Sequence, residues 1–223
     1  MQIIDYNALL LPQNVAIITH TIENDGILIY PTDTLYGLGG NFFSLPAMAK
    51  IDRIKGRKDL PYSAAVSGIR MLEQLVETIP TIFYELSEKL LPGKFTFLFK
   101  ASGTLDKRLL KNNDKIGIRI PDAPGILKLI EILNTPLIST SVNRSGEPPL
   151  NDPATIREFF SNIPGQGLLP VLIDKGILPP SSGSTVLDIT ATPIRCIRKG
   201  DDFNRLEELH IDFQPTEANK IGR

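Results

Sequence analysis

Short apolar runs rich in Ile, Val and Phe recur along the chain, and stretches with helical spacing separate several of them. The runs predict strands at residues 26–30, 63–66, 95–100, 116–120, 137–140, 171–173, 186–189 and 194–198. Helices are expected to begin where a capping side chain precedes a proline, at residues 44–46, 122–124 and 152–153. This alternation predicts an α/β fold with a twisted mixed sheet, in which some neighbouring strands late in the chain are antiparallel.

The length and composition favour one domain. The chain has 223 residues, of which 42% are hydrophobic, and this is enough to bury a sizeable core. We therefore expect a single domain over residues 1–223, with a core of about residues 10–200. The remaining residues, 201–223, are polar and irregular in pattern, and they predict a loosely held C-terminal tail.

The charge balance and the cysteine count exclude several classes of protein. Basic residues number 24 and acidic residues 25, so no global field recruits nucleic acid or a membrane surface, and any basic site must be local. One cysteine cannot form an intramolecular disulfide, and two isolated histidines cannot build a Cys/His metal cluster. The N-terminus has no signal-peptide pattern, and no apolar run approaches the ~20 residues of a membrane span. We expect a cytoplasmic protein without membrane contact and without a metal held by its own side chains.

Residues 29–40, IYPTDTLYGLGG, place polar side chains between an apolar strand and several glycines. Pro31 suits a strand end, and Thr32 and Thr34 point to the same side if the backbone after it stays extended. Two hydroxyls would then share one face. The alternative is a glycine-rich turn, in which Thr and Asp side chains make local backbone hydrogen bonds.

Residues 50–59, KIDRIKGRKD, form the densest basic patch of the chain. If the helix ends near Gly56, Lys55 and Arg57 project from its terminus and from the following loop, where two cations can converge on one polyanion such as phosphate. The alternative is a solvated basic helix end that complements the helix dipole.

Two later stretches carry polar groups next to strands. In PLISTSVNRSGEPP, residues 136–149, an apolar strand runs into Ser139, Ser141 and Asn143, at the kind of strand end where open α/β sheets bind ligands. A Ser/Asn-rich turn is the alternative there. The strand at residues 194–198 carries Arg195 and Arg198, which cannot both be core, so it also suits an edge strand protected by charge.

Taken together, these stretches resemble the YrdC/TsaC family of threonylcarbamoyl-AMP synthases. The resemblance covers about residues 10–200, nearly the whole chain. Six motifs occur in the family's order: P-T-D-T-x-Y-G-L-G at 31–39, K-x-R at 55–57, P-G-x-x-T-F at 92–97, I-G-I-R-I-P-D at 116–122, S-x-N at 141–143, and S-T-V-x-D with I-R-x-G at 184–200. The dinucleotide, P-loop and nucleophile-elbow signatures are absent.

The resemblance implies a YrdC-like twisted sheet flanked by helices, with a concave basic face like that of double-stranded-RNA-binding domains. The implied reaction joins L-threonine, bicarbonate and ATP into threonylcarbamoyl-AMP and pyrophosphate, for threonylcarbamoyladenosine modification of tRNA. By motif match, the catalytic set is Lys55, Arg57, Ser141 and Asn143, the ATP-binding set adds Arg198, and the threonine-binding set is Thr34, Arg119, Ser139 and Ser184.

These residue types suit the implied chemistry. A planar arginine fork such as Arg119 binds a carboxylate in bidentate fashion, and transfer at a phosphate needs positioning and charge stabilisation more than a protein nucleophile. Mg²⁺ is expected to accompany the triphosphate, held by phosphate oxygens and water. The implied partners are a tRNA threonylcarbamoyl-transferase complex that takes over the product and, through weak binding, tRNA or other RNA.

The chain departs from the family pattern in two places. After K-x-R the family carries a polar residue before the proline and a histidine soon afterwards, whereas this chain has Leu60 and no histidine. Tyr62, Ser63 or Ala65 would then build that wall of the threonine pocket. The chain also resembles the short members of the family, without an extra C-terminal domain.

Two alternatives to a synthase stay open from the sequence. One is a non-catalytic RNA-binding paralogue, although such chains are expected to lack the K-x-R or S-x-N pair that this one keeps. The other is a carbamoyl-transfer module of the hydrogenase-maturation type, which would come with zinc-finger cysteines in a longer chain.

Overall fold

The computed structural model describes residues 1–57, 59–163, 170–209 and 213–215. Within them the strands are β1 (Gln2–Asp5), β2 (Leu28–Pro31), β3 (Tyr36–Gly39), β4 (Ser63–Ala65), β5 (Phe95–Lys100), β6 (Lys115–Arg119), β7 (Leu137–Ser141), β8 (Val171–Asp174), β9 (Thr185–Asp188), β10 (Ile194–Arg198) and β11 (Phe213–Pro215). The helices are α1 (Pro12–Glu23), α2 (Leu45–Lys55), α3 (Ile69–Glu73), α4 (Thr81–Leu90), α5 (Pro124–Leu133), α6 (Pro153–Ser161) and α7 (Phe203–Glu208), with a 3₁₀ turn at η1 (Tyr6–Ala8).

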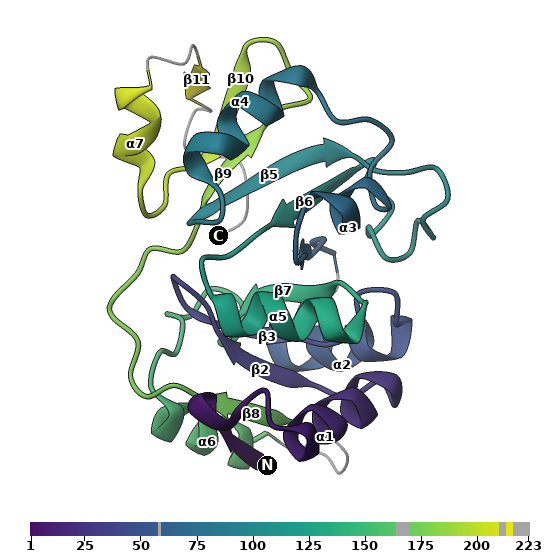
Figure 1. The fold of residues 1–223 in the computed structure, drawn as a ribbon, viewed down its shortest axis with the longest axis vertical. Helices are drawn as coiled ribbons and strands as arrows, with labels where there is room; N and C mark the ends of the chain where they lie inside the picture. The colour runs from purple at the N-terminus through teal and green to yellow at the C-terminus, as the bar shows by residue number, and fades with distance from the viewer. Residues whose placement is uncertain (58, 164–169, 210–212, 216–223) are drawn as a thin grey trace.

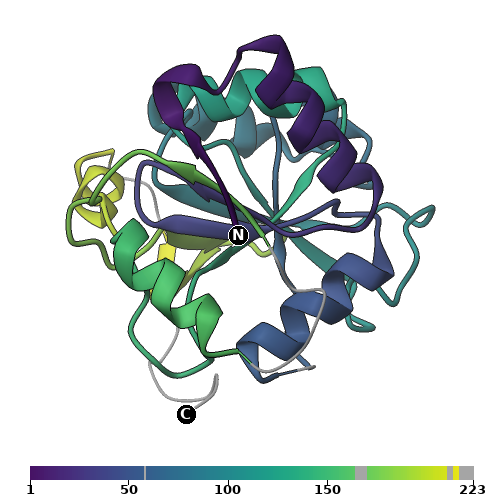
Figure 2. The same ribbon diagram turned by 90° about the horizontal axis from the view of Figure 1, so that it is seen from below.

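All of these strands join in one mixed sheet, in the order β1-β8-β2-β3-β7-β4-β6-β5-β9-β10-β11. Figure 1 shows β8 and β2 near one end of the molecule and β9 and β10 near the other. Helices α1 and α5 lie on one side of the strands and α2 and α6 on the opposite side, as the view from below shows (Figure 2). The predicted α/β fold with a twisted mixed sheet flanked by helices is therefore confirmed.

Local sequence signals place several elements correctly. The side chain of Ser44 accepts a hydrogen bond from the backbone of Ala47 and caps α2, and Asp152 caps α6 in the same way. Helix α2 ends where Gly56 adopts the left-handed conformation, as the basic stretch predicted. The residue before α5 is Ala123, so Asp122 is not its cap.

Each of the eight predicted strands is present, within two residues at either end. Strands β1, β3 and β11 and helices α1, α3, α4 and α7 were not predicted. Antiparallel pairing is not confined to the late strands, because β2 with β3 and β3 with β7 are also antiparallel.

The expectation of an irregular tail is wrong for its described part. Leu206 of α7 is fully buried, the rings of Phe203 and Phe213 meet edge to face at 5.5 Å, and β11 pairs in parallel with β10. Strand β10 is consequently flanked on both sides and is not an edge strand. The rest of the predicted tail, residues 210–212 and 216–223, lies outside the described residues, as does Lys58 of the basic stretch.

Strand β5 shows how one strand serves both the core and the opposite face of the sheet. Successive side chains of a strand alternate between faces, so Phe95, Phe97 and Phe99 share one face and Thr96 lies on the other. The ring of Phe83 from α4 contacts those of Phe97 and Phe99 edge to face, at 5.3 and 5.0 Å. Apolar packing against α4 therefore fixes the phenylalanine face of β5. The opposite face, which carries Thr96, is not needed for this packing and can hold polar groups.

Gly39 marks a close approach between β3 and its neighbours. A Cβ atom at this position would lie 2.5 Å from the carbonyl oxygen of Ile138 in β7 and 2.7 Å from the ring of Tyr30 in β2. Gly39→Ala should therefore destabilise the protein by about 1 to 3 kcal/mol, because backbone atoms have to shift. Urea unfolding measures this loss. Gly103→Ala is the matched control, since a Cβ there meets nothing within 4 Å; equal stability of the two variants would contradict the close approach.

Candidate functional site

A row of four paired residues crosses the neighbouring strands β6, β5, β9 and β10. Arg119 of β6 is paired with Thr96 of β5, Thr96 with Val186 of β9, and Val186 with Arg198 of β10. Side chains at directly paired positions point to the same face, so this row lies opposite the phenylalanine face of β5. Two arginines and a threonine hydroxyl are thus brought to one face by strand register alone.

The same face continues across the next strands. Ser63 of β4 is paired with Ser139 of β7, and Ser141, two positions further along β7, is paired with Gly37 of β3. Ser63 belongs to this face because Ala65, two positions later on β4, is paired with Arg119.

These side chains line a pocket of about 350 Å³. The lining residues include seven that were predicted as site residues: Thr34, Arg57, Arg119, Ser139, Ser141, Ser184 and Arg198. Tyr62 and Ser63 also line it, as expected for the altered wall, whereas Ala65 is buried and does not. Lys55 and Asn143 reach the pocket only through their contacts with Ser141.

The stretch after β2 forms a tight turn and does not continue as an extended strand. The hydroxyl of Thr32 donates to the carbonyl of Leu35 at 2.7 Å and accepts from the backbone N–H groups of Thr34 and Leu35, both at 3.2 Å. The alternative of local backbone hydrogen bonds is therefore correct for Thr32. The turn still brings the two predicted hydroxyls together, because Thr32 Oγ1 lies 3.1 Å from Thr34 Oγ1.

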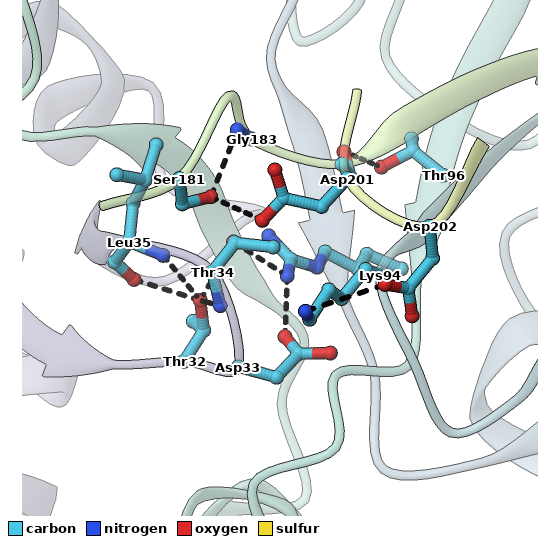
Figure 3. Close-up of polar contacts among 12 residues, drawn as sticks. Thr32, Asp33, Thr34, Leu35, Lys94, Thr96, Ser181, Gly183, Asp201 and Asp202 are labelled. Carbon is cyan, nitrogen blue, oxygen red and sulfur yellow. Dashed lines mark hydrogen bonds and ion pairs between the residues drawn. The ribbon is translucent and has the colours of Figure 1, made fainter. Parts of the chain in front are cut away.

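Arg119 is held by this turn through a buried ion pair. Its Nη2 donates to a carboxylate oxygen of Asp33 and, at 2.7 Å, to the hydroxyl of Thr34. The side chains of Arg119 and Asp33 are only 9% and 8% exposed. Figure 3 shows Asp33 and Thr34 side by side on the turn. The guanidinium of Arg119 was expected to be free for a ligand carboxylate, but one of its nitrogens is already bound by Asp33 and Thr34. A buried cation needs such a counter-ion within the protein.

The Asp33–Arg119 pair is not fully satisfied. Asp33 Oδ2 and Arg119 Nε are buried and have no hydrogen-bond partner among the described residues. In a bidentate arginine–carboxylate pair, two N–H groups of the guanidinium donate to the two carboxylate oxygens, so Asp33 Oδ2 and Arg119 Nε would both have been used. Arg119 therefore keeps hydrogen-bonding capacity beyond its contacts within the protein.

A second cluster joins Arg198, Ser184 and Thr96. Arg198 donates from Nη2 and Nε to the carbonyl of Ser184, at 2.8 and 3.1 Å, and from Nη2 to its hydroxyl at 3.1 Å. The hydroxyls of Ser184 and Thr96 lie 2.7 Å apart. Partial burial and the nearby charge of Arg119 both lower the pKa of Arg198. The two arginines repel each other across the pocket, and an anion between them would relieve this repulsion.

The segment before Ser184 is fixed by neighbouring carboxylates (Figure 3). Ser181 donates its hydroxyl to Asp201 at 2.6 Å and accepts from the backbone N–H of Gly183 at 2.9 Å. Lys94 pairs with Asp202 at 3.3 Å. The contacts with Asp201 hold the loop that leads into β9, whose residues Ser182 and Gly183 line the pocket.

Lys55, Ser141 and Asn143 form a third cluster. The ammonium group of Lys55 donates to Asn143 Oδ1 at 2.6 Å and to the carbonyl of Ser141 at 2.9 Å. Ser141 also donates its hydroxyl to Asn143 Oδ1 at 2.7 Å. Lys55 is buried, with 3% of its surface exposed, so the end of α2 is not a solvated basic terminus. Burial and the charge of Arg57 lower the pKa of Lys55 to about 8.

Two residues of this site, Asp33 and Thr96, were not predicted, and a third was predicted only in part. Asp33 lies between the two threonines of the PTDT motif, and its role depends on pairing with Arg119, which lies far along the chain. Thr96 belongs to the 92–97 motif, and its placement beside Arg119 depends on strand register that the sequence does not state. Tyr62 was named only as a wall residue, and its contact with Arg57 could not be foreseen.

The arrangement favours an anionic ligand. Arginines from three different segments, Arg57, Arg119 and Arg198, line the pocket, and no Asp or Glu is among the described residues that line it. Hydroxyl groups supply most of the remaining polar contacts. The pocket can therefore bind phosphate and carboxylate groups and stabilise negative charge that develops during a reaction. The broad concave basic face stays a prediction.

Removal of Asp33 should destabilise the folded protein. In Asp33→Ala the buried Arg119 loses its counter-ion, at an expected cost of about 3 to 5 kcal/mol in the free energy of unfolding. Urea unfolding measures the change. Asp106→Ala, which breaks the solvent-exposed pair with Arg108, is the control and should leave the stability unchanged. A wild-type unfolding midpoint for Asp33→Ala would show that Arg119 does not depend on this carboxylate.

The lowered pKa of Lys55 predicts that anion binding depends on pH. The ammonium loses its proton as the pH rises through about 8, well below the ~10.4 of a free lysine. Affinity for an anion such as sulfate should then fall above pH 8, by up to about tenfold per pH unit. Calorimetric titration between pH 7 and 9.5 measures this change. In Lys55→Met, binding should be weaker and nearly independent of pH; an unchanged pH profile in this variant would assign the titration to another group.

Comparison with known proteins gives a consistent family. The family model Sua5_yciO_yrdC, described as "Telomere recombination", matches residues 20–200. A relative from Pyrococcus abyssi, named "Threonylcarbamoyl-AMP synthase", is 30% identical over 180 residues, which cover 80% of this chain and 52% of the relative. This chain thus spans about half of the length of that relative. A protein of the same name from Dichelobacter nodosus is 32% identical over 165 residues, covering 69% of this chain and 82% of the relative.

Solved structures show the same fold. The crystal structure of P. abyssi Sua5 complexed with L-threonine superposes with a TM-score of 0.81 at 28% identity, over 91% of this chain and 59% of that one. The family model covers most of the chain, and the relatives match it across most of the same length. The chain therefore belongs to the Sua5/YciO/YrdC family.

Proposed function

We propose that this chain is a threonylcarbamoyl-AMP synthase, a nucleotidyltransferase that forms threonylcarbamoyl-AMP and pyrophosphate from L-threonine, bicarbonate and ATP. The names of its relatives and the L-threonine bound to P. abyssi Sua5 support this function. The observation that carries the proposal is the pocket itself, where three arginines and a set of hydroxyls converge on one face of the sheet. ATP and bicarbonate are anions and L-threonine carries a carboxylate group, and the arginines of the pocket supply positive charge to bind these groups together.

The threonine end of the pocket is proposed to be the side of Thr34, Arg119, Ser139 and Ser184. The Nη2 atom of Arg119 is engaged by Asp33 and Thr34, and its Nη1 has no hydrogen-bond partner among the described residues. The substrate carboxylate would bind at this remaining side of the guanidinium. Hydroxyls of the pocket would then receive the threonine side chain, since a site built for an OH group rejects ligands that lack one.

The ATP end is proposed to be the side of Lys55, Arg57, Ser141, Asn143 and Arg198. Lys55 and Arg57 flank Gly56 at the end of α2, and the charge of Arg57 is close enough to affect the pKa of Lys55. Two cations at this spacing can contact one polyphosphate. Ser141 lines the pocket directly, whereas Lys55 and Asn143 would act from behind it unless ATP draws the ammonium group forward.

The reaction then needs no protein nucleophile. The threonine amine condenses with bicarbonate to give the N-carboxylate and water. A carboxylate oxygen forms a bond to the α-phosphorus of ATP, while the bond from that phosphorus to the pyrophosphate oxygen breaks. The arginines hold the reacting groups in line and stabilise the negative charge that spreads over the phosphate oxygens, which accounts for most of the catalysis in this class of transfer.

Mg²⁺ is proposed to enter with ATP. No group of three His, Cys, Asp or Glu side chains in the described ranges could hold a metal ion, so phosphate oxygens, water and pocket hydroxyls would be its ligands. Bound there, Mg²⁺ would neutralise part of the triphosphate charge.

The cellular setting is part of the same proposal. The product would pass to a tRNA threonylcarbamoyl-transferase complex in the cytoplasm. Among the described residues, none of the helices has the length and apolar character needed to cross a bilayer. We further propose that residues 1–223 act as one domain, because one sheet and one cluster of buried side chains run through the described residues.

Pyrophosphate release tests the function. Purified protein with ATP and Mg²⁺ should release pyrophosphate only when both threonine and bicarbonate are present, and mass spectrometry should identify the adenylate. Equal release with bicarbonate removed would overturn the proposal. RNA affinity that falls steeply with salt, without any turnover, would instead support the RNA-binding paralogue.

One variant tests the threonine site in this assay, and a second serves as its control. Arg119→Lys should lower kcat/KM for threonine while ATP affinity stays near wild type, because a point charge cannot replace the planar guanidinium. Lys50→Ala should behave like wild type, because Lys50 donates to the carbonyl of Asp25 at 2.7 Å and does not line the pocket.

A further inference from the structure

Tyr62 lies at the point where this chain departs from its family's sequence pattern. The residue is 2% exposed, lines the pocket and precedes Ser63 of β4. The guanidinium carbon of Arg57 lies 5.3 Å from the centre of its ring. This distance is within the range of a cation–π contact, which is strongest where water is excluded.

The tyrosine ring is anchored through its hydroxyl group. Its hydroxyl donates to Asp52 Oδ1 at 2.8 Å, and the other oxygen of Asp52 is paired with Lys111. Burial, followed by the hydrogen bond and the charge of Asp52, raises the pKa of Tyr62, so the phenol keeps the proton that it donates. Asp52 and Lys111 are 11% and 15% exposed, which makes this anchor a buried and persistent one.

Arg57 itself has few other constraints. Its Nε is buried without a hydrogen-bond partner, and none of the carboxylates in the described part of the chain forms an ion pair with it. Its backbone N–H closes the end of α2 by donating to the carbonyl of Asp52 at 3.1 Å. The backbone is therefore fixed. The side chain is held by Tyr62, through the ring face and through a hydrogen bond to the phenol oxygen, and not by a carboxylate among the described residues.

We propose that Tyr62 is a positioning residue that holds the Arg57 guanidinium at the pocket wall for the phosphate groups of the nucleotide. An aromatic face orients the cation without neutralising it, whereas a carboxylate partner would compete with phosphate for the same N–H groups. Asp52 and Lys111 act one step further back by fixing the ring. This inference rests on the proposed function only in taking ATP as the ligand.

Nucleotide affinity tests the role of Tyr62 without requiring turnover. Tyr62→Leu removes the aromatic face and should weaken ATP binding about five- to thirtyfold. Tyr62→Phe keeps the face but loses the hydroxyl that anchors the ring, and it should show a smaller loss, of about threefold. Adenosine, which lacks phosphates, should bind all three proteins alike. Tyr84→Leu, which changes an exposed tyrosine of α4 that does not line the pocket, is the matched control and should bind ATP like wild type.

A double-mutant cycle separates positioning from a general loss of structure. In an Arg57→Ala background, Tyr62→Leu should cause no further loss of ATP affinity, because its effect acts through Arg57. Titrations are made well below the melting temperature of each variant. Tyr62→Met fills a similar volume without an aromatic face, and it replaces Tyr62→Leu in the cycle if that variant does not fold.

The outcomes are distinguishable from those of the synthase assay. Wild-type ATP affinity in Tyr62→Leu and Tyr62→Met, or losses that multiply with that of Arg57→Ala, would overturn the role of Tyr62 even in an active enzyme. Coupled losses in a protein without pyrophosphate release would support the role of Tyr62 and overturn the proposed reaction.

Discussion

The buried charge of Arg119 is the constraint on which the pocket depends. A guanidinium placed in the middle of a sheet cannot stay ionised there without a counter-ion, and the turn between β2 and β3 supplies one in Asp33. The same nitrogen, Arg119 Nη2, also donates to the hydroxyl of Thr34. The turn is therefore held against β6, and its side of the pocket wall meets the side formed by β6. The ion pair is thus a structural joint as well as part of the site. Its incomplete hydrogen bonding leaves Arg119 able to bind a further anion.

The pocket also requires that strands β5 and β6 have one apolar face, which packs in the core, and one polar face, which lines the pocket. In β5 every second residue is a phenylalanine that packs toward α4, and Thr96 between them faces the pocket. In β6 the alternation places Ile116 and Ile118 on one side and Arg119 on the other. The core therefore fixes the strands from behind, and strand register decides which polar side chains share the pocket face.

Local features of the site were predictable and long-range ones were not. The start of α2 at Ser44 and its end at Gly56 follow from capping chemistry, which depends on a few neighbouring residues. The roles expected of Lys55 and Arg57 followed from that helix end, yet the burial of Lys55 beneath Ser141 and Asn143 depends on β7, far along the chain. The same reason explains why Asp33 was missed. Strand β3 was overlooked because its glycines look like a turn, although they permit close packing against Tyr30.

Three of the bonds that assemble the pocket span long stretches of sequence. Arg119 and Thr34 are 85 positions apart, Lys55 and Ser141 are 86 apart, and Thr96 and Ser184 are 88 apart. Each bond closes a large loop, and the chain loses conformational entropy when the loop closes. Contacts between such distant residues therefore form slowly during folding. A partly folded chain consequently lacks the contacts that close the pocket. Its ligand binds only to completed molecules and shifts the folding equilibrium toward them by mass action.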